Sequence, residues 1–167
     1  MALGASLSDS DSIAKRLSRV IEATYGRPAL LFTDSGTSAL RYALQLASLN
    51  ATLVAVPGFG CIDVGAAAQG AGHQIIAYDL DPATLSPDPD SVERALRRGA
   101  KVVVASHLFG LAIRMTEVAS SCERYGATLI EDAAQAFGAR KGNRFVRWRD
   151  QLTTAVDAIR HWPCRAA

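Results

Sequence analysis

Apolar and polar residues alternate in two rhythms along this chain. Short, almost continuously apolar runs are separated by stretches whose apolar residues recur every three or four positions, the spacing of a helix buried on one face. Continuously apolar runs are typical of parallel strands that are covered on both faces. We therefore expect strands near residues 29–33, 52–56, 74–78, 101–105 and 127–131.

The stretches between these runs predict helices. The first passes through Ile13, Leu17, Val20 and Ile21, and later ones are expected after Thr37 and over Ile62–Ala71, Ser91–Arg98 and Met115–Tyr125. Strands that alternate with helices predict an α/β fold in three layers, with a mainly parallel sheet between the helices.

The pattern changes after Gly142. From about Phe145 the residues show no clear period, although Gln151–Arg160 favours one more helix. We expect one domain, or part of a larger one, over residues 1–144 and a tail of different character over 145–167.

Composition narrows the functional classes. The hydrophobic fraction of 49% and charged fraction of 20% suit a compact soluble domain, and a net charge of +2 is too small to favour nucleic acid or an anionic membrane as partner. We find no apolar stretch of membrane-spanning length and no signal peptide. Cys61, Cys122 and Cys164 form neither a disulfide framework nor a zinc pattern, so we expect a cytoplasmic protein without a metal site.

Two acids, Glu131 and Asp132, end the last predicted strand, and Gln135 follows three residues later. A carboxylate at this end of a parallel strand faces the crevice in which open α/β sheets bind ligands. Asp132 has three interpretations. It is a metal-binding acid of a nucleotide hydrolase, which the missing phosphate loop disfavours; a structural acid that caps the following turn; or the partner of a pyridinium nitrogen, an ion pair that would keep Asp132 ionised.

A second candidate lies where the first predicted run meets a helix, in the sequence Ser35-Gly36-Thr37-Ser38. Backbone N–H groups at a helix start, with hydroxyls beside them, can bind phosphate. The simpler interpretation is that Ser35 or Thr37 only caps the helix.

Two further residues have unremarkable interpretations. His107 follows a predicted strand, where histidine is sometimes catalytic but more often packed or hydrogen-bonded. Cys61 is expected to be a small buried apolar residue rather than a nucleophile, since no partner base can be named.

The order SGTSAL, VPGFGC, YDLDPATLSPD, SHLFG and IEDAAQAFGA resembles the N-terminal part of the large domain in the DegT/StrS family, the sugar-nucleotide aminotransferases that depend on pyridoxal 5′-phosphate (PLP). The resemblance covers roughly residues 13–143. It implies the aspartate-aminotransferase type of fold, a homodimer, and transfer of an amino group from glutamate to a keto group on a nucleotide-linked sugar. Such sugars enter antibiotics or polysaccharides.

The resemblance also implies roles for individual residues. Thr37 and Ser38 match the positions that bind the cofactor phosphate, Asp132 the acid that pairs with the pyridine nitrogen, and Gln135 the glutamine beside the ring hydroxyl. Cys61 stands where many members carry an aromatic ring stacked on the cofactor, which is a departure from the family pattern.

A larger departure concerns the lysine that forms the Schiff base with PLP. The family places it a few tens of residues after the acid, whereas the lysines of this chain are Lys15, Lys101 and Lys141. None matches, and the small C-terminal domain is missing. We therefore expect a truncated or frame-shifted product that is inactive alone and binds PLP weakly at most. The alternatives are a non-catalytic ligand-binding or interaction module and a remnant without stable function.

Overall fold

The helices and strands are assigned from a computed structural model that describes residues 7–25, 31–50, 52–136, 139–141 and 144–145. The chain divides into two units, residues 1–33 and 34–167. In the first unit, α1 (Leu7–Tyr25) confirms the predicted N-terminal helix. In that helix Ile13 and Val20 are exposed, while Leu17 and Ile21 are half-buried.

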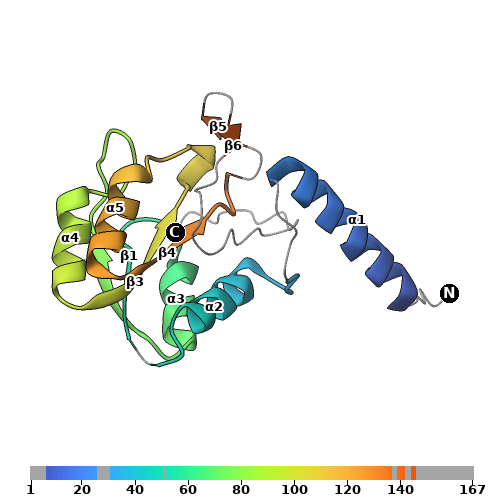
Figure 1. The fold of residues 1–167 in the computed structure, drawn as a ribbon, viewed down its shortest axis with the longest axis horizontal. Helices are drawn as coiled ribbons and strands as arrows, with labels where there is room; N and C mark the ends of the chain where they lie inside the picture. The colour runs from blue at the N-terminus through green and yellow to red at the C-terminus, as the bar shows by residue number, and fades with distance from the viewer. Residues whose placement is uncertain (1–6, 26–30, 51, 137–138, 142–143, 146–167) are drawn as a thin grey trace. The chain divides into compact units, whose positions relative to one another are not determined.

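The second unit is built on a four-stranded parallel sheet (Figure 1). Its strands are β1 (Leu53–Pro57), β2 (Gln74–Tyr78), β3 (Ala100–Ser106) and β4 (Thr128–Asp132). They lie in the order β2-β1-β3-β4, and each pair is parallel. Parallel neighbours end at one edge of the sheet, so the loops after Pro57, Tyr78, Ser106 and Asp132 share its carboxyl edge.

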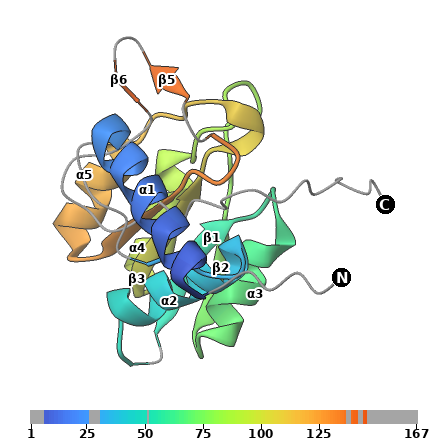
Figure 2. The same cartoon turned by 90° about the vertical axis from the view of Figure 1, so that its right-hand side faces the viewer.

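Four helices cover the two faces of this sheet (Figure 1, Figure 2). They are α2 (Gly36–Ala47), α3 (Ile62–Gly70), α4 (Pro89–Arg97) and α5 (Thr116–Tyr125). A short 3₁₀ turn, η1 (Leu108–Gly110), follows β3, and β5 (Arg140–Lys141) pairs antiparallel with β6 (Arg144–Phe145). These elements confirm the predicted three-layer α/β class.

Each face of the sheet has its own apolar core. Leu44 of α2 and Ala68 of α3 pack with Val102 and Ile130 on one face. On the other face the helices α4 and α5 cover the alternate strand residues, including Val103 and Leu129. Because successive strand residues point to opposite faces, the strands are apolar throughout and show no alternation.

Local sequence explains where several helices begin and end. Ser35 caps α2 by accepting the Ser38 N–H at 3.2 Å, and Asp88 caps α4 by accepting the Ser91 N–H at 3.0 Å. Pro89 stands in the first turn of α4, where a missing N–H costs nothing. Gly126 ends α5 with φ of 60°, a left-handed conformation that glycine adopts without strain.

The prediction of a strand over residues 29–33 was wrong for its described part. Residues 29 and 30 lie outside the described residues, and Leu31 to Thr33 form no strand. Leu31 is 61% and Phe32 39% exposed, so this apolar run lacks the two-sided cover of a parallel strand. The helix predicted over 151–160 also lies outside the described residues. Within the described part of the chain, no helix has the length and apolar character that would span a membrane.

Candidate functional site

The carboxyl ends of β3 and β4 carry two pairs of polar side chains, one pair on each face of the sheet. Ser106 lies opposite Asp132 in the parallel register. Both continue the rows of Val102, Val104 and Ile130, which pack against α2 and α3. His107 and Glu131 are one residue out of phase, on the face that α4 and α5 cover. The two acids that end β4 therefore have different surroundings.

Asp132 has a protein hydrogen-bond donor on each carboxylate oxygen. The Ser106 hydroxyl donates to Oδ2 at 3.0 Å, and the Ala134 backbone N–H donates to Oδ1 at 3.1 Å. The second contact confirms that Asp132 caps the turn that follows β4. Capping does not exclude a ligand, since a carboxylate offers about four lone-pair positions. Asp132 is half-buried at the sheet edge and can meet a ligand there.

His107 and Glu131 form a buried pair on the opposite face. The His107 Nε2 lies 2.6 Å from Glu131 Oε1, and the side chains are 1% and 9% exposed. His107 Nδ1 accepts the Ile113 backbone N–H at 3.1 Å, so Nδ1 carries a lone pair and Nε2 carries the proton. His107 is thus a neutral donor to a carboxylate. This confirms the packed interpretation of His107 over the catalytic one.

Gln135 holds the loop that follows β3. Its Oε1 accepts the Phe109 backbone N–H at 2.9 Å. Phe109 is non-glycine yet left-handed, with φ of 56°, a conformation that costs on the order of 1–2 kcal/mol. The bond from Gln135 helps to hold it there. Because the amide oxygen binds Phe109, the amide N–H₂ is the group of Gln135 that can donate to a ligand.

The start of α2 combines a cap with an anion-binding geometry. The first helical bond runs from the Ala39 N–H to the Ser35 carbonyl, and Ser35 Oγ accepts the Ser38 N–H. The N–H groups of Gly36 and Thr37 precede that first bond and point out of the helix. Ser35 also donates its hydroxyl to Ser38 Oγ at 3.0 Å. The capping interpretation is therefore confirmed for Ser35, while Thr37 and Ser38 occupy the first turn.

Chain connections direct this first turn toward the carboxyl edge. Five residues join Ala47, the last residue of α2, to Leu53, the first residue of β1, so α2 ends near the amino edge. Twelve helical residues span about 18 Å, close to the length of a five-residue strand. Since α2 packs on the face that bears Asp132, its first turn extends back toward the edge where Asp132 lies.

Cys61 precedes α3 at the same edge of the sheet. The expectation of a buried Cys61 was wrong: its side chain is exposed, because it stands at the helix start in the loop after β1. Partial burial raises the pKa of the Cys61 thiol, and the negative charges of Asp63 and Asp132 raise that pKa further. Because Cys61 follows β1 and Asp132 ends β4, the parallel sheet places both residues at its carboxyl edge.

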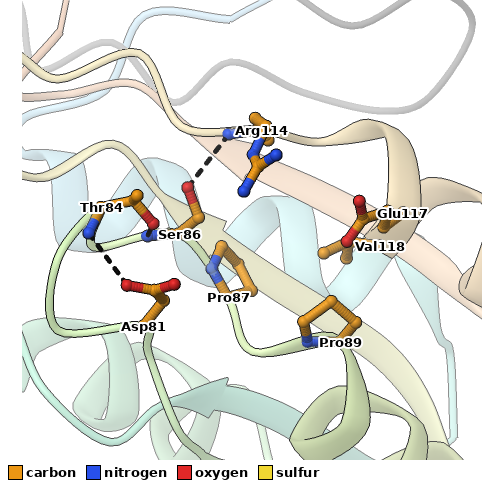
Figure 3. A pocket seen from close by; sticks show the side chains of 8 residues that line it. All are labelled: Asp81, Thr84, Ser86, Pro87, Pro89, Arg114, Glu117 and Val118. Carbon is orange, nitrogen blue, oxygen red and sulfur yellow. Dashed lines mark hydrogen bonds between the residues drawn. The ribbon is translucent and has the colours of Figure 1, made fainter.

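A small hollow lies elsewhere, between the loop after β2 and the start of α5 (Figure 3). There Asp81, Thr84 and Ser86 face Arg114 and Glu117, and Ser86 Oγ accepts the Arg114 N–H at 3.3 Å. A volume of about 40 Å³ admits a few water molecules and no cofactor-sized ligand. None of the five predicted site residues lines it. Among the described residues, no group of three metal-binding side chains is assembled.

Two contributors to the site were missed from sequence. Ser106 contacts Asp132 because the register pairs the two residues, whereas Glu131 pairs with Ala105 and contacts His107, the residue that follows β3. The sequence does not state this register. A signal did exist: polar residues stand at or just after the end of both predicted strands, and parallel neighbours that end together bring such residues side by side.

Several known proteins with similar sequences are named aminotransferases. The chain is 35% identical over 137 residues to 3-amino-5-hydroxybenzoate synthase of Amycolatopsis mediterranei, covering 81% of this chain and 35% of that protein. It is 33% identical over 131 residues to L-glutamine:2-deoxy-scyllo-inosose aminotransferase of Streptomyces fradiae, covering 78% and 31%. The chain thus spans about a third of the length of these relatives.

Solved structures agree with this match. The crystal structure of 3-amino-5-hydroxybenzoic acid synthase superposes with a TM-score of 0.72 at 35% identity, over 79% of this chain and 35% of that one. NtdA from Bacillus subtilis, solved with its cofactor PMP (pyridoxamine 5′-phosphate) bound, gives 0.70 at 28% identity, over 75% and 29%. The sequence pattern of one family matches residues 7–154. On these grounds, together with the sheet order and the polar strand ends, the chain belongs to the DegT/DnrJ/EryC1/StrS aminotransferase family.

Proposed function

We propose that residues 34–136 form the part of a PLP-dependent aminotransferase that binds the phosphate and the pyridine ring of the cofactor. The observation that carries the proposal is the Asp132 carboxylate, which lies at the carboxyl end of β4 on the face that α2 covers. A half-buried carboxylate and a helix start on one face supply the charge and the N–H groups that suit a protonated pyridine and a phosphate.

The residues present fit the cofactor by their chemistry. The Gly36 and Thr37 N–H groups, with the hydroxyls of Thr37 and Ser38, would bind the phosphate. Asp132 would hold a proton on the ring nitrogen, and the N–H₂ group of Gln135 suits a ring oxygen as acceptor. When bound, PLP supplies a ring that withdraws electrons and stabilises negative charge on the substrate carbon beside it.

Cys61 would lie beside the cofactor without providing an aromatic ring. Its raised pKa keeps the thiol protonated near neutral pH, so the side chain adds no negative charge next to Asp132. The stacking contact that many family members make is therefore replaced by a smaller contact.

We further propose that this chain holds the cofactor reversibly. Lys101 is exposed at the second position of β3, five residues before Ser106, which places it about 16 Å along the strand from the carboxyl edge. Lys15 lies in the first unit and Lys141 only nine residues after Asp132. The proposal takes none of the three as the lysine that attaches the cofactor covalently in the family.

The substrates are proposed from the family. We propose an amino acid of the glutamate or glutamine type as donor and a keto group on a sugar-like ring, nucleotide-linked in the family, as acceptor. Names of relatives support this choice, since one pairs L-glutamine with 2-deoxy-scyllo-inosose. The homodimer, the domain boundary at residue 144 and a cytoplasmic location stay predictions.

A titration with PLP tests the proposal. We expect saturable binding that is reversed by dialysis, and no lysine adduct after treatment with borohydride. Asp132→Ala should abolish binding, because the protonated ring loses its counter-charge. Asp81→Ala is the matched control: the Asp81 carboxylate also accepts backbone N–H groups, in the loop after β2. Absence of saturable binding in a folded sample would contradict the cofactor site, and an adduct at Lys141 would contradict the reversible mode.

A further inference from the structure

A buried hydroxyl contacts the acid of the proposed site from the neighbouring strand. Ser106 is the last residue of β3, is 8% exposed, and donates to Asp132 Oδ2 at 3.0 Å. The register pairs Ser106 with Asp132 directly, so the contact is fixed by the β3–β4 ladder and not by a mobile loop.

Two donors to Asp132 act on different oxygens. The Ala134 N–H binds Oδ1 and the Ser106 hydroxyl binds Oδ2. One bond alone would let the carboxylate rotate about its Cβ–Cγ bond, whereas one bond on each oxygen fixes its plane. A carboxylate that is already oriented loses less conformational freedom when a ligand binds.

We propose that Ser106 is a positioning residue that orients Asp132 for a protonated pyridine nitrogen. The inference rests on the proposed cofactor site and goes beyond it, because it assigns a role to a residue outside that set. The Ser106 hydroxyl needs no contact with the ligand. Its effect reaches the ring nitrogen through Asp132.

A positioning role of Ser106 predicts a selective effect on ligand binding that a general loss of structure would not produce. Removing the hydroxyl should weaken only those ligands whose ring nitrogen pairs with Asp132. Pyridoxamine 5′-phosphate has that nitrogen, no aldehyde, and no need of a lysine. Its 1-deaza analogue, in which C–H replaces the ring nitrogen, keeps the phosphate and the amine and serves as the matched ligand.

The experiment measures both dissociation constants by calorimetry for the full chain and its variants. We expect the unsubstituted chain to prefer pyridoxamine 5′-phosphate over the deaza analogue. Ser106→Ala should weaken the former about tenfold, the scale of a charge-assisted hydrogen bond, and leave the latter within a factor of two. Ser106→Thr keeps a hydroxyl on a β-branched residue that suits a strand, and should retain the preference.

Ser121→Ala is the control for the substitution itself. Ser121 is also buried, at 4% exposure, but lies within α5, where it accepts a bond from Arg124. It should change neither constant. If Ser106→Ala does not fold, Ser106→Cys replaces it, because the thiol keeps the volume but is a weak donor.

The outcomes separate the two proposals. If the unsubstituted chain shows no preference for the ring nitrogen, the cofactor site itself is wrong. If it shows the preference and Ser106→Ala, or Ser106→Cys, keeps it in full, the cofactor site stands and the role of Ser106 is refuted. Equal weakening of both ligands also refutes it, since that pattern indicates a structural role.

Discussion

The His107–Glu131 pair gives the sharpest prediction about stability. His107 donates from Nε2 to the Glu131 carboxylate and accepts the Ile113 N–H at Nδ1, all within a buried environment. The pair joins the ends of β3 and β4, and its Nδ1 bond fixes the loop that leads from η1 toward α5. Replacing His107 with alanine removes both bonds at once.

The expected cost follows from these two bonds. A hydrogen bond to a charged group contributes about 1.5–3 kcal/mol and a neutral one about 1 kcal/mol, so His107→Ala should lower the free energy of unfolding by about 2.5–4 kcal/mol. Loss of the packed ring adds to this value. Domains of this kind have about 5–15 kcal/mol in total, so the effect is large.

A double-mutant cycle isolates the pair. Urea unfolding of the original chain, His107→Ala, Glu131→Ala and the double variant gives the coupling energy. We expect about 1.5–3 kcal/mol of coupling between the two side chains. The same cycle on Glu93 and Arg97, whose N···O distance is 2.8 Å on the surface of α4, should give a smaller coupling, because solvent screens it. Coupling below about 0.5 kcal/mol in the buried pair would refute the assignment of proton and charge.

Three further predictions concern other parts of the second unit. Ser35→Ala removes the cap of α2 and should destabilise the chain by about 1 kcal/mol in urea, while an unchanged midpoint would contradict the cap. Hydrogen bonding to Arg97 lowers the pKa of Glu93, so ionised Glu93 stabilises the folded state. This stabilisation is present above the unfolded-state pKa and is lost as pH falls through the folded-state pKa. In thermal melts, the melting temperature of Glu93→Gln should therefore fall less steeply toward acid pH than that of the original chain. Burial raises the pKa of Cys122 to about 12, whereas Cys61 is exposed. Iodoacetamide should therefore label Cys61 in the folded chain, slowly at neutral pH because the pKa of Cys61 is also raised, and should label Cys122 only on unfolding. Peptide mass spectra measure both rates, and equal rates would contradict the assigned burial.

Most of the α/β architecture could be predicted from the sequence, because the spacing of apolar residues was unambiguous. The runs around Val54, Val103 and Ile130 are apolar at successive positions, which only two-sided cover explains, and all became central positions of parallel strands. The run at Leu31 had the same composition but no such cover among the described residues. Composition alone does not distinguish a strand from an apolar loop, because pairing is a tertiary property.

The site was predictable to the level of residues and not of contacts. Asp132 was identified because a carboxylate at the carboxyl end of a predicted parallel strand faces the crevice in which such sheets bind ligands. That Glu131 turns to the opposite face and binds His107 depends on strand alternation and register together. Cys61 was misjudged because cysteine is usually buried, whereas the start of a helix after a glycine-containing loop exposes it.

The protonation state of a bound ring nitrogen tests the central claim most directly. Pyridoxamine 5′-phosphate labelled with ¹⁵N in the ring would be bound to the chain at a pH where the free compound is unprotonated, and its ¹⁵N chemical shift recorded. The account predicts the shift of a protonated pyridinium, and loss of that signal in Asp132→Ala but not in Asp81→Ala. A bound ligand with an unprotonated nitrogen, or a protonated one that survives Asp132→Ala, would contradict the assignment of Asp132 as its counter-charge.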